Sequence, residues 1–198
     1  MFDAPSSDHV RTLVEALGGK MPTEQEVRDA WKAHYPNLTL RAVCAQTKGL
    51  NWRKEKPVKI GCCVLGHDGR GNFDSRSVGW NNTPRRLSEA EKQYFKPCAE
   101  KYAVLHCLKR GLIPVGMMIF TDHNQPDDVT GLQRPAFCSC SYCASWMETI
   151  RLPSEFLIET MRPRLGTDPP NKDLFVSDRY SLGRLIDMHK DAFGQKQS

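Results

Sequence analysis

The sequence predicts a domain of the α/β class, because segments with helical spacing alternate with short apolar segments of β-strand character. The chain has 198 residues, enough to bury a sizeable core as one domain. Hydrophobic residues make up 39% of the chain and charged residues 26%, which are the proportions of an ordinary globular protein. The composition therefore argues against a disordered chain.

The first part of the chain is expected to be helical. An apolar pattern that stops at a glycine pair predicts one helix, and a second helix is predicted to run through Trp31. Thr23 and Glu26 have the spacing of a capping box, in which the two residues satisfy each other's backbone N–H groups at the start of a helix. We expect residues 1–50 to form a helical segment packed on a main domain of residues 51–198.

Two strands joined by a tight turn are predicted next, over residues 58–65 and 73–80. The stretch between them reads His-Asp-Gly-Arg-Gly, which is typical of a turn. A mostly buried helix then begins at Cys98 and stops at Gly111. This pattern puts the cysteine at the N-terminus of a helix.

The remaining sequence continues the alternation. It predicts a buried strand over residues 115–120, a helix that opens near Cys140, a short strand at 175–176 and a helix over residues 182–193. His189 on the last helix is expected to face solvent. No internal repeat interrupts the pattern.

Charge and hydropathy limit the partners and the location. The formal net charge of +5 favours anionic partners only weakly, because the basic residues are scattered. No apolar stretch approaches the roughly 20 residues of a membrane span, and the first residues lack the layout of a secretory signal, so we expect a cytoplasmic protein with no membrane partner.

The eight cysteines of the chain should then stay reduced. Four of them lie in apolar patterns and are expected to be buried: Cys44, Cys62, Cys63 and Cys107.

The cysteines at two predicted helix starts are candidates for a metal site. Cys98 opens one helix, and the C-x-x-C pair Cys140 and Cys143 opens another about forty residues later. Helix N-termini favour the thiolate form of cysteine, and three thiolates suit Zn²⁺ with a fourth position open to water. Glu100, two residues after Cys98, could lie beside the metal without binding it and move protons. Water acidified by zinc and a carboxylate that shuttles protons are what hydrolytic deamination of an amino-bearing ring requires.

This set of residues resembles the cytidine deaminase superfamily in its three-cysteine form, and most closely the branch that acts on free nucleosides. The resemblance covers roughly residues 55–193 and depends mainly on Cys98-Ala99-Glu100 and the C-x-x-C pair. It implies a three-layer α/β/α fold with a mixed central sheet, a Zn²⁺ cofactor and a homo-oligomer, dimer or tetramer. It further implies that Asn81 and Ala99 contact the substrate, cytidine or deoxycytidine, and that Lys101 offsets thiolate charge.

Departures from the family pattern keep other functions open. Thr83 stands where the nucleoside branch has a glutamate for the ribose, so a nucleotide, transfer RNA or single-stranded DNA with cytosine or adenine is an alternative substrate. Ser139 stands where the signature has proline. Cys138 could replace Cys140 as a ligand, or could close a four-cysteine site in a zinc-stabilised binding module without catalysis.

Overall fold

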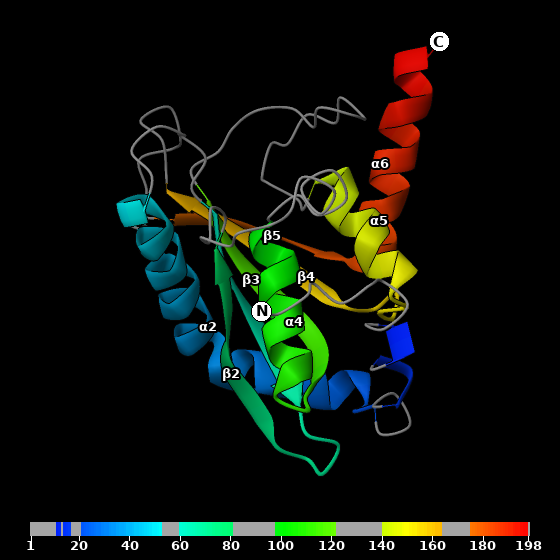
Figure 1. The fold of residues 1–198 in the computed structure, drawn as a ribbon. Helices are drawn as coiled ribbons and strands as arrows, with labels where there is room; N and C mark the ends of the chain where they lie inside the picture. Colours follow the sequence, from blue (N-terminus) through cyan, green and yellow to red (C-terminus); the bar gives the residue numbers. More distant parts are fainter. Residues whose placement is uncertain are drawn as a thin grey trace.

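The computed structural model describes residues 11–12, 14–16, 21–52, 60–80, 98–121, 140–163 and 175–197. They form a five-stranded mixed sheet with helices on both faces, which confirms the predicted α/β class (Figure 1). None of the helices in these ranges combines the length and apolar character needed to span a membrane. The elements in chain order are α2 (Glu24–Trp52), β1 (Ile60–His67), β2 (Phe73–Trp80), α4 (Ala99–Lys109), β3 (Ile113–Thr121), α5 (Ser141–Thr149), β4 (Leu157–Pro163), β5 (Phe175–Ser181) and α6 (Leu182–Gln197).

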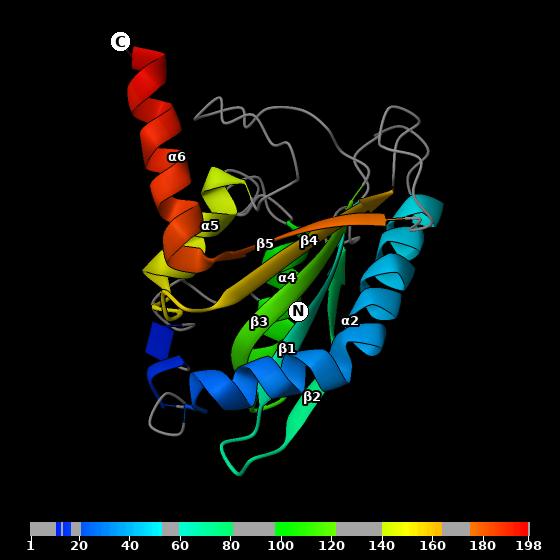
Figure 2. The ribbon, with the colours of Figure 1, turned by 180° about the vertical axis from the view of Figure 1, so that it is seen from behind.

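The strand order is β2-β1-β3-β4-β5. β3 and β4 run parallel, while the other neighbouring strands are antiparallel. Side chains alternate across the sheet, so that Cys62 and Met117 join a core with α4, α5 and α6, whereas Cys63 and Met118 join a core with α2. The described elements therefore form three layers, and among them α2 is the helix that covers one face of the sheet (Figure 2).

α2 is longer than the sequence predicts. Its start is the expected capping box: the Thr23 backbone N–H donates to the Glu26 carboxylate at 2.7 Å, and the Glu26 N–H donates to the Thr23 hydroxyl at 3.3 Å. The helix continues beyond Trp31 to Trp52 with Pro36 inside it, and it bends along its length (Figure 2). Proline lacks an N–H and crowds the preceding turn, so it bends this helix without ending it.

The turn between β1 and β2 forms as predicted. The Asp68 carboxylate accepts hydrogen bonds from the N–H groups of Arg70 and Asn72 at 2.7 and 3.0 Å. Gly69 and Gly71 have φ values of 74° and 96°, in the left-handed region that glycine adopts readily. The hairpin thereby fixes the register of β1 against β2.

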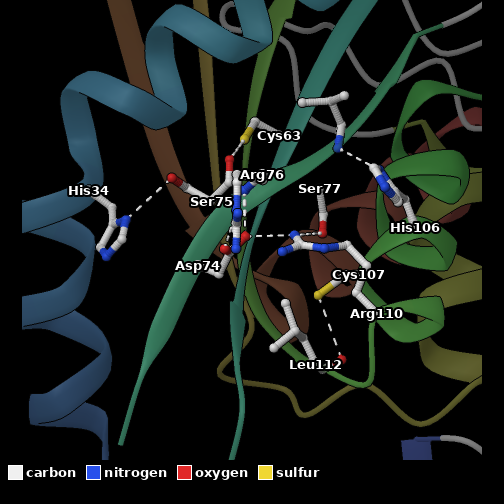
Figure 3. Close-up of polar contacts among 11 residues, drawn as sticks. His34, Cys63, Asp74, Ser75, Arg76, Ser77, His106, Cys107, Arg110 and Leu112 are labelled. Carbon is white, nitrogen blue, oxygen red and sulfur yellow. Dashed lines mark hydrogen bonds and ion pairs between the residues drawn. The ribbon is translucent and has the colours of Figure 1, made fainter.

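Polar contacts fasten α4 to β2, as Figure 3 shows. Arg110, just after the helix, donates to the Asp74 carboxylate at 2.6 Å and to the Ser77 hydroxyl at 3.2 Å. The Arg110 hydrogen bond holds the pKa of Asp74 well below its usual range. The backbone N–H of Val78 donates to Nδ1 of His106 at 3.2 Å. α4 is therefore tied to the edge strand along its last turns.

Two expectations about burial are wrong. Cys44 is exposed, because Ala42 and Ala45 occupy the face of α2 that meets the sheet. His189 is buried, because it follows Leu185 by four residues and so lies on the same side of α6 as that core residue. The other cysteines of this group are buried as predicted: Cys62, Cys63 and Cys107.

Candidate metal centre

Three cysteines from two helix starts meet at one point. The Sγ atoms of Cys98, Cys140 and Cys143 all lie within 4.8 Å of one another. Cys143 is buried, and the other two are partly buried. They come from segments about forty residues apart in the sequence, so the fold brings together the group that the spacing predicts.

Local backbone geometry directs these thiols. Cys98 and Cys140 are the N-cap residues of α4 and α5, with extended backbone at φ −91°, ψ 139° and φ −63°, ψ 158°. The N–H groups of Cys143 and Ala144 donate to the Cys140 carbonyl at 2.9 and 3.0 Å, which closes the first turn of α5. That turn brings the Sγ of Cys143 back to the side of Cys140.

The pKa values of two of the three thiols are raised, and in both cases a hydrogen bond with Cys140 is the largest cause. The pKa of Cys98 is well above its usual range, mainly because of a hydrogen bond with Cys140, and burial adds to the effect. The pKa of Cys143 is likewise raised by hydrogen bonds with Cys140 and Cys98 and by burial. Crowded thiolates repel one another, whereas a cation among them stabilises the deprotonated forms. The positive ends of two helix dipoles also favour negative charge here.

The donor set fits a soft divalent metal. Tetrahedral zinc with Zn–S bonds of about 2.3 Å separates neighbouring sulfurs by about 3.8 Å, a little less than the 4.8 Å within which these atoms lie. Three sulfurs can therefore close on an ion with small movements of the side chains. They leave one of four coordination positions for a ligand from outside this group.

Glu100 is the acidic residue nearest to the cluster in sequence. It is only 4% exposed and lies in the first turn of α4. Its charge acts on Cys98 and Cys143 and raises the pKa of both thiols. It is not one of the three clustered ligands. A buried carboxylate thus lies close enough to the sulfurs to act on their ionisation.

Lys101 adds a buried positive charge to this region. It is 5% exposed, and its Nζ lies 5.5 Å from the ring centroid of Trp146 in α5. Lysine is rarely buried without a compensating group, and an aromatic face supplies part of that compensation. Trp146 is a site residue not predicted from the sequence. It lies three residues after Cys143, on the same side of α5, and this spacing could have indicated it.

Some of the other predicted site residues lie within the described part of the structure, and others lie outside it. Ala99 is fully buried in the first turn of α4, where its backbone packs against β2. Asn81 follows Trp80, the last residue of β2, and lies outside the described residues, as do Thr83 and Cys138. The structure therefore brings together the three cysteines, Ala99 and Glu100, and leaves the choice between Cys138 and Cys140 untested.

Comparison of the chain with models of known protein families and with curated protein sequences finds no match. The resemblance to cytidine deaminases is accordingly carried by this chain's own residues and by no matched relative. What the structure contributes is a mixed-sheet α/β fold and three cysteines that could bind a metal ion.

Proposed function

We propose that the protein is a zinc-dependent hydrolytic deaminase that converts a cytosine-type base to the uracil form and releases ammonia. The observation that carries this proposal is the buried Glu100 carboxylate beside a three-thiol cluster. A structural zinc site uses four protein ligands and needs no neighbouring carboxylate, whereas a hydrolytic site has three ligands and an open position. The three-sulfur group and Glu100 match the second arrangement.

A bound Zn²⁺ supplies a Lewis acid that lowers the pKa of water to about 7. Glu100 takes a proton from water and gives it to the ring nitrogen, so that the water oxygen can bond to the carbon that bears the amine. The carboxylate then takes the second proton of the water and passes it to the amine. The carbon–nitrogen bond breaks, ammonia leaves, and Glu100 returns to its ionised form.

Charge balance supports a role for Lys101. Three thiolates and one divalent cation leave a net charge of −1, and the Glu100 carboxylate adds another. The buried ammonium of Lys101 offsets one of these charges. Without it, excess negative charge would weaken the acidifying effect of the metal on water.

The favoured substrate is cytidine or deoxycytidine, with Asn81 and the backbone near Ala99 holding the base, as the family resemblance implies. The test is to incubate the zinc-loaded protein with cytidine, deoxycytidylate, adenosine and single-stranded DNA, and to measure released ammonia. We expect release from cytidine or deoxycytidine. Release from DNA alone, with binding that weakens steeply as salt rises, would favour the nucleic-acid alternative. No release from any substrate, with full zinc occupancy, would favour the binding module.

The same resemblance leads us to propose a homo-oligomer, dimer or tetramer. Tyr142 beside the cluster is 46% exposed, and Phe193 on α6 is 42% exposed, so apolar surface is available for contact between copies. Light scattering on the purified chain tests this: a mass of 22.5 kDa would mean a monomer and would exclude the oligomer.

A further inference from the structure

A hollow of about 780 Å³ lies between the first half of α2, the end of β5 and the start of α6. It exists because α2 packs against β1, β2 and β3 and leaves the β4–β5 side of this face less covered. Its described lining includes no residue of α4 or α5, so it is separate from the cysteine cluster. Pockets for small ligands commonly have volumes of roughly 300 to 1,000 Å³.

One wall of the hollow is built on a buried carboxylate. Glu159 is 2% exposed and accepts hydrogen bonds from Nε1 of Trp31 at 3.1 Å, the Tyr35 hydroxyl at 2.9 Å and Nε of Arg179 at 2.8 Å. These bonds satisfy the carboxylate and hold Trp31 and Arg179, which both line the hollow. The wall is therefore rigid and its charges are paired.

The rim carries charges of both signs that are not paired. Within the part of the chain that the structure describes, Lys32 and Arg184 have no carboxylate partner, and Glu155 and Asp187 have no cation partner. Glu155 accepts a hydrogen bond from the Ser154 hydroxyl at 2.6 Å, which lowers its pKa and keeps it ionised. Charges of both signs therefore line the same hollow.

Apolar side chains complete the lining, from Val27 of α2 and Leu157 of β4 next to Trp31. A purely anionic ligand would meet two unpaired carboxylates here, and a purely cationic one would meet Lys32 and Arg184. A ligand that carries a carboxylate, an ammonium group and an apolar body can satisfy all three parts of the lining. We propose that this hollow binds a small zwitterion of the amino-acid type with an apolar side chain.

Three probes that share the isobutyl group of leucine test the proposal by calorimetry on the full chain: L-leucine, 4-methylpentanoate, which lacks the amine, and 3-methylbutylamine, which lacks the carboxylate. We expect leucine to bind, and each analogue to bind about tenfold or more weakly, the effect of losing one charge-assisted hydrogen bond. No heat of binding with leucine at millimolar concentration would overturn the proposal. Equal affinity for leucine and either analogue would also overturn it.

Variants of the rim residues test which side chains bind the carboxylate of the ligand and which bind its ammonium group. Arg184→Gln and Lys32→Gln should weaken binding of leucine about tenfold and leave 3-methylbutylamine unaffected, whereas Asp187→Asn should weaken leucine and leave 4-methylpentanoate unaffected. These side chains are exposed, so the variants should fold. Lys190→Gln on the same helix is the control, because Lys190 does not line this hollow. Leucine binding that survives all three rim variants unchanged would place the ligand elsewhere and contradict the assignment.

Discussion

Gly79 of β2 and Ala99 of α4 approach so closely that a β-carbon on residue 79 would lie 2.2 Å from the carbonyl oxygen of Ala99. The same atom would lie 2.6 Å from the backbone nitrogen of Ala103. The first turn of α4 carries Glu100, two residues after the Cys98 cap, and it thus rests on the bare backbone of a strand. This contact sets the distance between the strand end and the candidate metal centre.

Gly79→Ala should therefore push the first turn of α4 away from the sheet. Overpacking against backbone cannot be relieved by a rotamer change, so we expect a loss of about 3 kcal/mol in the free energy of unfolding. We also expect weaker zinc binding, because Cys98 moves with the helix. Denaturant unfolding and a competition assay with a zinc chelator measure the two effects.

Gly194→Ala on α6 is the matched control, because a β-carbon there meets no atom within 4 Å. Alanine is favoured over glycine inside a helix, so this variant should be as stable as the parent or slightly more stable. If Gly79→Ala behaves like Gly194→Ala, the close contact does not constrain the site.

The cysteines should differ sharply in their effect on metal content. Cys98→Ser and Cys143→Ser each remove one of three sulfurs and should lower zinc from one per chain to well under half. Cys44→Ser should keep full zinc, because Cys44 is exposed on the outer side of α2. Elemental analysis of the purified variants gives the stoichiometry. Full zinc in Cys98→Ser would mean that the ion lies elsewhere.

Glu100→Gln separates binding from chemistry. The amide has nearly the same shape but cannot accept and return a proton, so kcat should fall by about 10²- to 10⁴-fold while zinc content stays at one per chain. Ammonia release and elemental analysis on the same preparation test both parts. Unchanged turnover would remove Glu100 from the mechanism.

Zinc affinity should rise with pH. The pKa values of Cys98 and Cys143 are raised in the metal-free protein, so these thiols are protonated at neutral pH and must lose their protons when the metal binds. Three thiols give a rise of up to about a thousandfold in apparent affinity per pH unit below their pKa values. A chelator competition between pH 6 and 8 measures the slope. An affinity independent of pH would contradict thiolate ligation.

Local signals made much of this fold predictable. The Thr23 and Glu26 spacing marks the start of α2, and the glycines after Asp68 mark the hairpin, because each satisfies backbone groups within a few residues. Cys98 and Cys140 could be assigned to helix starts in the same way. The proximity of the three sulfurs could be predicted because cysteines at such spacing commonly bind one metal ion together.

Features that depend on tertiary packing could not be predicted. α2 continues past Pro36 because its far half packs on the sheet, which outweighs the local cost of proline. The burial of His189 depends on α5 lying against α6, and the burial of Glu159 depends on donors more than 120 residues earlier in the sequence. No periodicity encodes such long-range partners.

The most direct test of the account is X-ray absorption at the zinc edge of the zinc-loaded protein. We expect three sulfur scatterers at about 2.3 Å and one oxygen or nitrogen scatterer, because the cluster has three thiols and an open position. Four sulfur scatterers would mean that a fourth cysteine closes the site, and a coordination shell without sulfur would mean that the cluster does not bind the metal; either result would contradict the proposed hydrolytic site.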